Sequence, residues 1–142
     1  GHADLAVLDI SGVALERSKA RLGSDAAKIE WIVADIVRWQ PPRTWNIWHD
    51  RAVFHFLTDP ASQDAYIAAL RAGTTAGSHV IMATFAPDGP EKCSGLPVQR
   101  YSPQSLAERL GAGFGLYAQD RESHATPFGT SQAFSYAAFR RV

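Results

Sequence analysis

The fold is decided by the stretch Trp48-His49-Asp50-Arg51-Ala52-Val53-Phe54-His55-Phe56-Leu57. It follows two strand-like runs, residues 5–9 and 29–36, and the first is typical of a strand buried on both faces of a parallel sheet. Each run carries a carboxylate at or near its end, Asp9 in the first and Asp35 in the second. Strands in this order, alternating with helix-forming segments, predict an α/β protein with a mostly parallel sheet covered by helices on both faces.

Capping and breaking residues predict the other elements. Helix-forming stretches follow Ser11-Gly12, Asp59-Pro60 and Ser102-Pro103, and each stops before a glycine. We expect further strands over residues 45–53, 77–86, 114–119 and 132–140. The run 77–86 is the most apolar and is predicted to be central. The polar segment 120–131 separates the last two strands and predicts a long antiparallel hairpin.

Length and charge limit the classes of function. The 142 residues fit one domain, residues 1–142, and 14 Lys and Arg balance 14 Asp and Glu. This balance provides no strong field for a nucleic acid or an anionic membrane, so neither is an expected partner. No apolar run approaches the ~20 residues of a membrane span. Cys93 is the single cysteine, which excludes an internal disulfide and a cysteine zinc site and favours a reducing, cytoplasmic location.

In this order, residues 6–10, 31–36 and 48–57 resemble the second, third and fourth strands of a class I S-adenosylmethionine-dependent methyltransferase. The segment 95–102 resembles a bacterial branch of small-molecule methyltransferases, distantly similar to thiopurine methyltransferases. The resemblance implies a Rossmann-like three-layer α/β/α sandwich with a C-terminal antiparallel hairpin. The family's first strand and its Gly-x-Gly loop have no counterpart before Gly1, so we expect a truncated domain whose central first strand is missing.

The missing strand has a physical consequence. In the family it lies between the second and fourth strands, and its loss leaves two sheet edges with unpaired backbone groups. We therefore expect a gap at this place, pairing of residues 5–9 with residues 46–52, or self-association of chains through the free edges.

The resemblance also implies a nucleoside site for the cofactor S-adenosylmethionine. Asp9 would accept hydrogen bonds from the paired ribose hydroxyls, which a carboxylate does well, and Asp35 would accept from the adenine amine. Apolar contact with the ring is expected from Ile10, Ala34 and Ile36. The alternative is structural: either aspartate caps the helix that follows it or only ends a strand.

Asp50 and Arg51 are expected at the reacting end of the cofactor, since they end the predicted fourth strand. Arg51 is suited to a forked pair with a carboxylate, although a structural ion pair is an equal interpretation. Asp50 and His55 are the candidate catalytic residues, His55 as the base that takes a proton from an acceptor thiol or amine. The alternative for His55, beside two phenylalanines, is packing.

These features predict methyl transfer to a small-molecule acceptor by in-line displacement, a reaction that needs alignment and exclusion of water and no metal ion. The segment 87–101 is expected to form a loop over the binding site, with Cys93 as a candidate pocket residue. Two alternatives stay open: a fragment of an NAD-type dinucleotide-binding oxidoreductase, in which an acid after the second strand also binds ribose, and a non-catalytic nucleotide-binding module.

Overall fold

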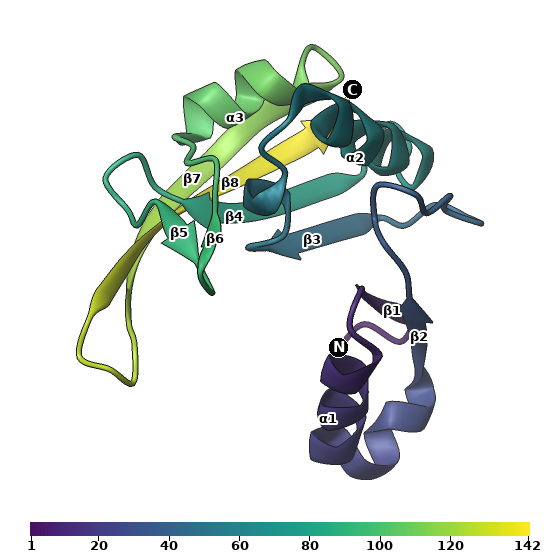
Figure 1. Ribbon diagram of the computed structural model, residues 1–142. Coiled ribbons are helices and arrows are strands. Elements are labelled where there is room, and N and C mark those ends of the chain that lie inside the picture. The colour runs from purple at the N-terminus through teal and green to yellow at the C-terminus, as the bar shows by residue number, and fades with distance from the viewer. The chain divides into compact units, whose positions relative to one another are not determined.

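The computed structural model describes residues 1–142 and contains two compact units, Gly1–Gln40 and Pro41–Val142. Each unit contains two parallel strands joined through a helix (Figure 1). These β-α-β connections confirm the predicted α/β class. The expectation of one domain over residues 1–142 stays a prediction.

The first unit consists of β1 (Leu5–Asp9), α1 (Gly12–Leu22), the 3-10 helix η1 (Gly23–Lys28) and β2 (Ile29–Val33). β1 and β2 pair in parallel along their whole length. The Ser11 side chain accepts a hydrogen bond from the Ala14 amide at 3.2 Å and so caps α1, as predicted.

The second strand is shorter than the sequence predicts, because β2 ends at Val33 and not at Ile36. The Asp35 carbonyl accepts hydrogen bonds from the amides of Arg38 and Trp39, both at 2.9 Å. These bonds close a turn, so residues 34–36 of the predicted strand lie outside it.

The second unit has a four-stranded sheet made of β3 (Ile47–Arg51), β4 (His79–Phe85), β7 (Phe114–Ala125) and β8 (Ser131–Arg141). The strand order is β3-β4-β8-β7, with β3 parallel to β4 and the other neighbours antiparallel. β4 is therefore internal to this sheet, as predicted. β1 and β3 belong to different sheets, so the expected alternative of pairing between residues 5–9 and 46–52 is not formed.

Two helices, α2 (Pro60–Ala72) and α3 (Pro103–Leu110), lie on the same face of this sheet (Figure 1). Each begins with the predicted cap, since the Asp59 and Ser102 side chains accept hydrogen bonds from the amide three residues later. The helices bury apolar residues at intervals of three or four toward the sheet: Tyr66, Ile67 and Leu70 from α2, and Leu106 and Leu110 from α3.

The C-terminal hairpin is confirmed, but its strands are longer than expected. β7 continues to Ala125 and β8 begins at Ser131, whereas the sequence predicts a loop over 120–131. β4 pairs with β8 only as far as Phe134, so the hairpin extends beyond the carboxyl end of β4. Strand residues that pack on no helix carry polar side chains, which hides them from a hydrophobic pattern.

The expected loop 87–101 contains a short hairpin of its own. β5 (Lys92–Cys93) and β6 (Leu96–Pro97) pair around Ser94 and Gly95, whose φ angles are 50° and 78°. None of the helices combines the length and apolar character that a bilayer crossing requires.

Candidate functional site

Asp9 ends β1, and Asp35 lies two residues after the end of the neighbouring strand β2. Asp9 pairs with Val33 across the two strands, and its carbonyl accepts a hydrogen bond from the Ala34 amide at 3.1 Å. Both aspartates are half-buried. The structure therefore brings the two predicted nucleoside ligands to one edge of the β1-β2 pair.

Each of these carboxylates also makes a local hydrogen bond. Oδ1 of Asp9 accepts from the Ser11 amide at 2.8 Å, and Oδ1 of Asp35 accepts from the Val37 amide at 3.2 Å. Oδ2 of Asp35 lies 4.0 Å from Nε of Arg38. Each carboxylate thus binds the amide two residues on, but neither caps a helix, since Ser11 caps α1 and a turn follows Asp35. Oδ2 of Asp9 makes no hydrogen bond and can accept from a ligand.

The predicted apolar contacts differ in exposure. Ile10 directly follows Asp9 and is 69% exposed, Ala34 is half-buried, and Ile36 is 9% exposed. Contact of these three residues with the adenine ring stays a prediction.

Asp50 is the penultimate residue of β3, is only 5% exposed and belongs to a buried hydrogen-bond network. Its Oδ1 accepts from the Val53 amide at 2.9 Å. Its Oδ2 accepts from the Phe54 amide at 3.0 Å and from the Tyr66 hydroxyl at 2.6 Å. Trp48 Nε1 donates to the same hydroxyl at 3.1 Å.

Burial raises the pKa of the Asp50 carboxyl above its ordinary value of 3.8, and the three hydrogen bonds partly oppose this. The network holds the turn that leads from β3 into the 3-10 helix η2 (Phe54–Phe56). Both carboxylate oxygens have protein donors, so the contacts favour a structural role for Asp50. Its catalytic role stays a prediction.

Arg51, the next residue, is exposed and has different partners. Its Nε donates to the Tyr136 hydroxyl at 3.1 Å, and its guanidinium lies 4.4 Å from the centroid of the Phe134 ring. The Tyr136 hydroxyl in turn donates to Oε2 of Glu122 at 2.8 Å. Arg51 is therefore held by β8 through two neutral aromatic side chains, and the structural ion pair that the sequence left open is not formed.

His55 lies in η2 and is 0% exposed. Its Nδ1 accepts from the Phe85 amide at 3.1 Å, and its ring packs edge-on against Phe56 at a centroid distance of 4.8 Å. Its Nε2 is buried without a hydrogen-bond partner. Burial lowers the pKa of His55 from 6.5 to about 4, so the ring is neutral at pH 7. These surroundings favour the packing alternative, and its role as a base stays a prediction.

The structure adds residues that the sequence did not single out. Ala83 and Phe85 from the end of β4 form a buried cluster with Phe134 from the first part of β8. Four partly buried residues pack against it: Ala52, Cys93, Val98 and Tyr136. The predicted pocket residue Cys93 thus lies with residues of the hairpin. The two-residue spacing of Phe134 and Tyr136 in the sequence indicates that they share one face of a strand. Nothing in the sequence indicates that this face contacts Arg51.

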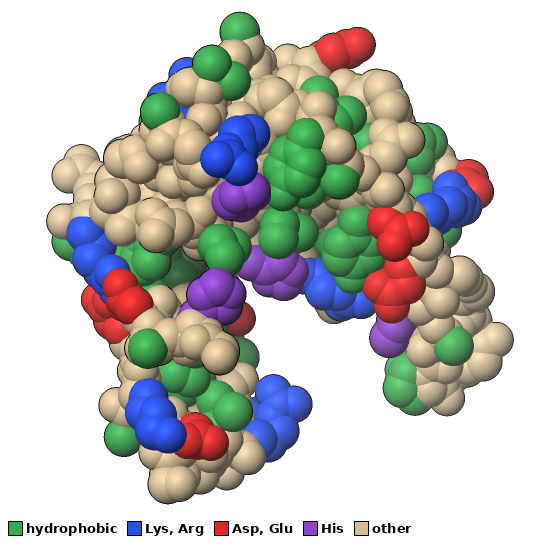
Figure 2. Space-filling model, turned by 180° about the vertical axis from the view of Figure 1, so that it is seen from behind, with side chains coloured by type: hydrophobic (Ala, Val, Ile, Leu, Met, Phe, Trp, Pro, Cys, Tyr) green, Lys and Arg blue, Asp and Glu red, His purple; other side chains and the backbone are tan.

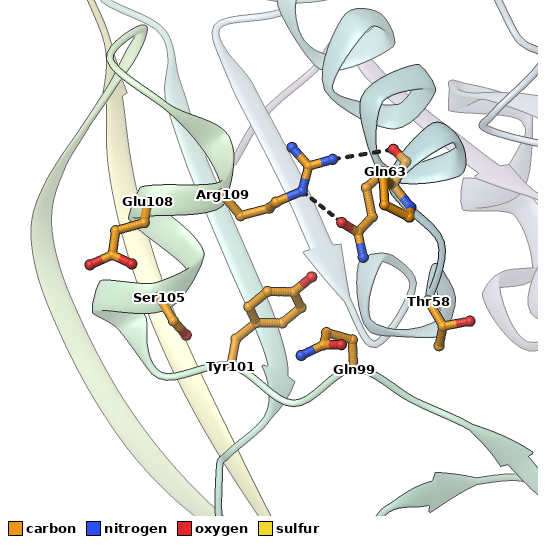
Figure 3. Close-up of a pocket in the computed structure, with 8 residues that line it drawn as sticks. Thr58, Gln63, Gln99, Tyr101, Ser105, Glu108 and Arg109 are labelled. Atoms are coloured by element: carbon orange, nitrogen blue, oxygen red, sulfur yellow. Dashed lines mark hydrogen bonds between the residues drawn. The ribbon is translucent and has the colours of Figure 1, made fainter.

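A cavity of about 470 Å³ opens between α2 and α3 (Figure 3). Tyr101, which is 5% exposed, points its hydroxyl into the cavity toward the place where Arg109 meets Gln63. Burial raises the pKa of Tyr101, so this hydroxyl is a hydrogen-bond donor at neutral pH.

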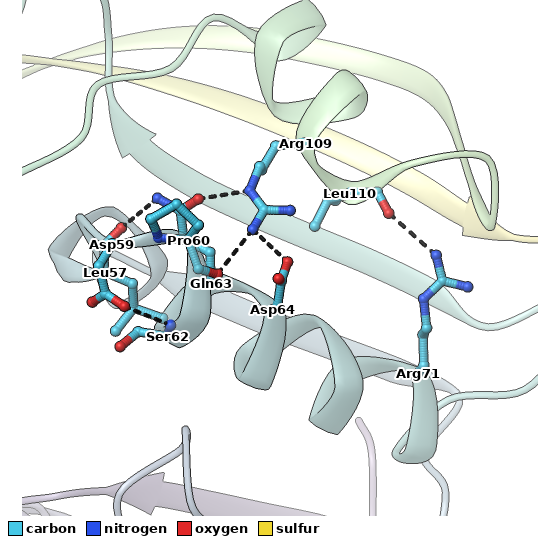
Figure 4. A network of polar contacts seen from close by, with 9 residues as sticks. All are labelled: Leu57, Asp59, Pro60, Ser62, Gln63, Asp64, Arg71, Arg109 and Leu110. Carbon is cyan, nitrogen blue, oxygen red and sulfur yellow. Dashed lines mark hydrogen bonds and ion pairs between the residues drawn. The ribbon is translucent and has the colours of Figure 1, made fainter.

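Arg109 itself joins the two helices (Figure 4). Its Nε donates to Gln63 Oε1 at 2.6 Å, and its Nη2 donates to Asp64 Oδ1 at 2.6 Å and to the Pro60 carbonyl at 3.2 Å. Gln63 Nε2 donates to the Leu57 carbonyl at 2.8 Å. Because most of its N–H groups donate to α2, Arg109 holds the two helices that line the cavity together.

Histidine, hydrophobic and cationic side chains gather on the surface seen from behind in Figure 2. At the amino end of β4, His79 contacts two neighbouring side chains. His79 Nδ1 is 2.9 Å from the Tyr117 hydroxyl, and Arg140 Nη1 is 3.1 Å from His79 Nε2. Arg140 can only donate, so Nε2 accepts and Nδ1 carries the proton. No group of three or more His, Cys, Asp or Glu side chains is arranged to hold a metal ion.

Neither the models of known protein families nor the curated proteins give a match to this sequence. Solved structures do match its fold. The N-methyltransferase NodS from Bradyrhizobium japonicum WM9, in complex with S-adenosyl-L-homocysteine, is 14% identical with a TM-score of 0.68; the match covers 97% of this chain and 66% of NodS. A methyltransferase from Mesorhizobium loti is 16% identical with a TM-score of 0.74, over 99% and 82% of the two chains.

A third match is 1,6-didemethyltoxoflavin-N1-methyltransferase from Burkholderia thailandensis, with bound 1,6-didemethyltoxoflavin and S-adenosylhomocysteine. It is 16% identical with a TM-score of 0.72, over 100% of this chain and 62% of that one. The chain thus spans just under two thirds of NodS and of this enzyme. These similarities confirm the predicted Rossmann-like fold of class I S-adenosylmethionine-dependent methyltransferases.

Proposed function

We propose that this chain belongs to an S-adenosylmethionine-dependent methyltransferase that acts on a small-molecule acceptor. The observation that carries the proposal is the placement of Asp9 and Asp35 at one edge of the β1-β2 pair. The fold similarity supports it, and two of the matched structures contain S-adenosylhomocysteine. A cytoplasmic location and self-association through free sheet edges are parts of the same proposal.

The nucleoside is assigned to the first unit. Oδ2 of Asp9 is available for a ribose hydroxyl, while its Oδ1 is held by Ser11, so the carboxylate is oriented before the ligand binds. Asp35 accepts from the adenine amine, and the base contacts Ile10, Ala34 and Ile36. The cofactor, when bound, supplies an electrophilic methyl group on a sulfonium.

The protein's task is then alignment of the acceptor and exclusion of water. Asp50 shapes the end of β3 by holding the turn into η2, and this turn positions Arg51 and His55. Arg51 remains assigned to the reacting end. His55 and Asp50 are proposed to move a proton. Because both are buried, they do so only in a conformation in which the acceptor reaches them.

Calorimetric titration of the natural protein with S-adenosylhomocysteine tests the proposal. Binding is expected, and Asp9→Asn is expected to weaken it about 10- to 100-fold, because charged hydrogen bonds contribute ~1.5–3 kcal/mol. Asp35→Asn weakens it as well. The matched control is Asp25→Asn in the same unit, where the exposed side chain only pairs with Lys28.

Equal affinities of the Asp9 and Asp25 variants for S-adenosylhomocysteine would remove the nucleoside assignment. Binding of NAD in place of S-adenosylhomocysteine would favour the oxidoreductase alternative. Cofactor binding without methyl transfer to any of a broad set of acceptors would favour a non-catalytic module.

A further inference from the structure

Arg51 is restrained in a way that fixes the direction of its guanidinium. The chain turns directly after it, because Ala52 has a φ angle of 64° and donates its amide to the Ala83 carbonyl at 2.9 Å. The Nε–H group is bonded to Tyr136, and the cation lies over the ring of Phe134. A planar cation held at Nε and along one face loses little further freedom when its outer edge binds a ligand.

The outer edge is unused. Nη1 and Nη2 of Arg51 make no hydrogen bond and no ion pair. The Tyr136 hydroxyl donates its single proton to the carboxylate of Glu122. Because that proton is committed to Glu122, the lone pairs of the hydroxyl are left for Nε of Arg51. The contacts thus orient the arginine without neutralising it directly.

Apolar side chains adjoin this cation. Phe134 and Phe85 are buried beneath it, at 3% and 0% exposed, and their rings meet edge-to-face at a centroid distance of 4.9 Å. The half-buried side chains of Cys93, Val98 and Tyr136 pack against these rings and are the ones that a ligand can reach. All of these groups belong to the second unit, at the carboxyl end of β4, where ligands bind in open α/β sheets.

We propose that Arg51 binds a carboxylate carried by the methyl acceptor, whose apolar body packs on the half-buried side chains of Val98, Cys93 and Tyr136. Two parallel hydrogen bonds from Nη1 and Nη2 match the two oxygens of a carboxylate. This inference rests on the proposed function, and it assigns Arg51 to the acceptor and not to the carboxylate of the cofactor. The acceptor class is therefore an organic acid with an aromatic or aliphatic body.

The test uses phenylacetate and its neutral amide, phenylacetamide, as probes of the same shape. Nuclear magnetic resonance follows the Arg51 Nε–H and Tyr136 ring signals of the natural protein during titration, with and without saturating S-adenosylhomocysteine. Phenylacetate is expected to shift these signals to saturation, and phenylacetamide to bind at least ~10-fold more weakly, the loss of one charged pair. Binding of phenylacetate is expected to persist with S-adenosylhomocysteine present.

Three variants complete the test. Arg51→Gln abolishes the selectivity for the acid, and Arg51→Lys weakens it because an ammonium does not reproduce the fork. Arg140→Gln, an exposed arginine at the opposite end of the same sheet, keeps it. Equal binding of acid and amide, or equal behaviour of Arg51→Gln and Arg140→Gln, overturns the inference.

The two proposals fail separately in this experiment. Displacement of phenylacetate by S-adenosylhomocysteine assigns Arg51 to the cofactor and overturns the inference while supporting the proposed function. Absence of S-adenosylhomocysteine binding removes the proposed function, and the signals of Arg51 then decide whether the carboxylate site exists on its own.

Discussion

The hydroxyl of Tyr66 lies 2.6 Å from Oδ2 of Asp50, and this contact joins the middle of α2 to the end of β3. Tyr66 is 1% exposed and Asp50 is 5% exposed, so the bond lies out of solvent. The same carboxylate caps the turn that follows β3. The buried Asp50 carboxylate therefore connects Tyr66 of α2 to the end of β3, where Arg51 lies.

Tyr66→Phe is expected to lower the free energy of unfolding by about 1.5–3 kcal/mol, because Asp50 loses a donor that it cannot replace with water. Trp48 Nε1 loses its acceptor in the same variant. Urea denaturation monitored by tryptophan fluorescence measures the change. Tyr117→Phe serves as the control, since this hydroxyl is exposed, and it is expected to change stability by less than ~0.5 kcal/mol. An equal decrease in the free energy of unfolding in both variants would mean that the buried hydrogen bond stabilises the protein no more than an exposed one does.

His55 is expected to make stability depend on pH below neutrality. Burial lowers its pKa to about 4 in the folded protein, whereas the unfolded chain retains the ordinary value of 6.5. As the pH falls from 6.5 toward 4, the unfolded state takes up a proton that the folded state does not, so the free energy of unfolding decreases.

His55→Asn removes this group while leaving an acceptor for the Phe85 amide. The variant is expected to be less stable than the natural protein at pH 7, through lost packing, and the difference is expected to shrink between pH 6.5 and 4. Urea denaturation at several pH values measures both curves. Parallel curves would show that the histidine takes up a proton as easily in the folded state.

Arg109→Met is expected to cost about 1–2 kcal/mol of unfolding free energy, measured in urea, since it removes three hydrogen bonds between α3 and α2. Asp64→Asn removes only the exposed half of an ion pair, with Asp64 71% exposed, and is expected to cost less than ~1 kcal/mol. A loss of the same size in both variants would assign the effect to the ion pair and not to Gln63 and Pro60.

Gly89→Ala is expected to destabilise the protein by about 1–3 kcal/mol, because an added Cβ would lie 2.8 Å from the Ala133 carbonyl oxygen and 3.0 Å from that of Ala86. The contacts are backbone atoms, which cannot rotate away. Gly12→Ala is the control, since its Cβ would meet only the Val33 side chain at 3.8 Å. Thermal unfolding compares the two, and an unchanged midpoint for Gly89→Ala would mean that segment 87–101 adjusts without cost.

Local signals in the sequence determined the order of the elements. Asp59 and Ser102 cap their helices as expected, because a cap depends only on amides within the next turn. Asp9 was also placed correctly at the end of its strand, since an apolar run followed by an acid is a local pattern, whereas Asp35 lies two residues beyond the end of β2.

Only the tertiary structure decided the surroundings of the candidate catalytic residues. Asp50 and His55 look equally available in sequence, yet both are buried, because helix α2 and strand β4 pack over them. The length of the hairpin was likewise not visible, since polar strand residues carry no hydrophobic alternation.

By itself, then, the sequence determined the α/β class and the helix caps, and it predicted the two acids of the nucleoside site. The tertiary structure decided which groups Arg51 meets, since Tyr136 lies 85 residues away and reaches it only through the pairing of β3, β4 and β8. The reason is range: capping and burial patterns act within a few residues, whereas a contact across a sheet depends on strand order and register, which the side chains of one strand do not encode alone.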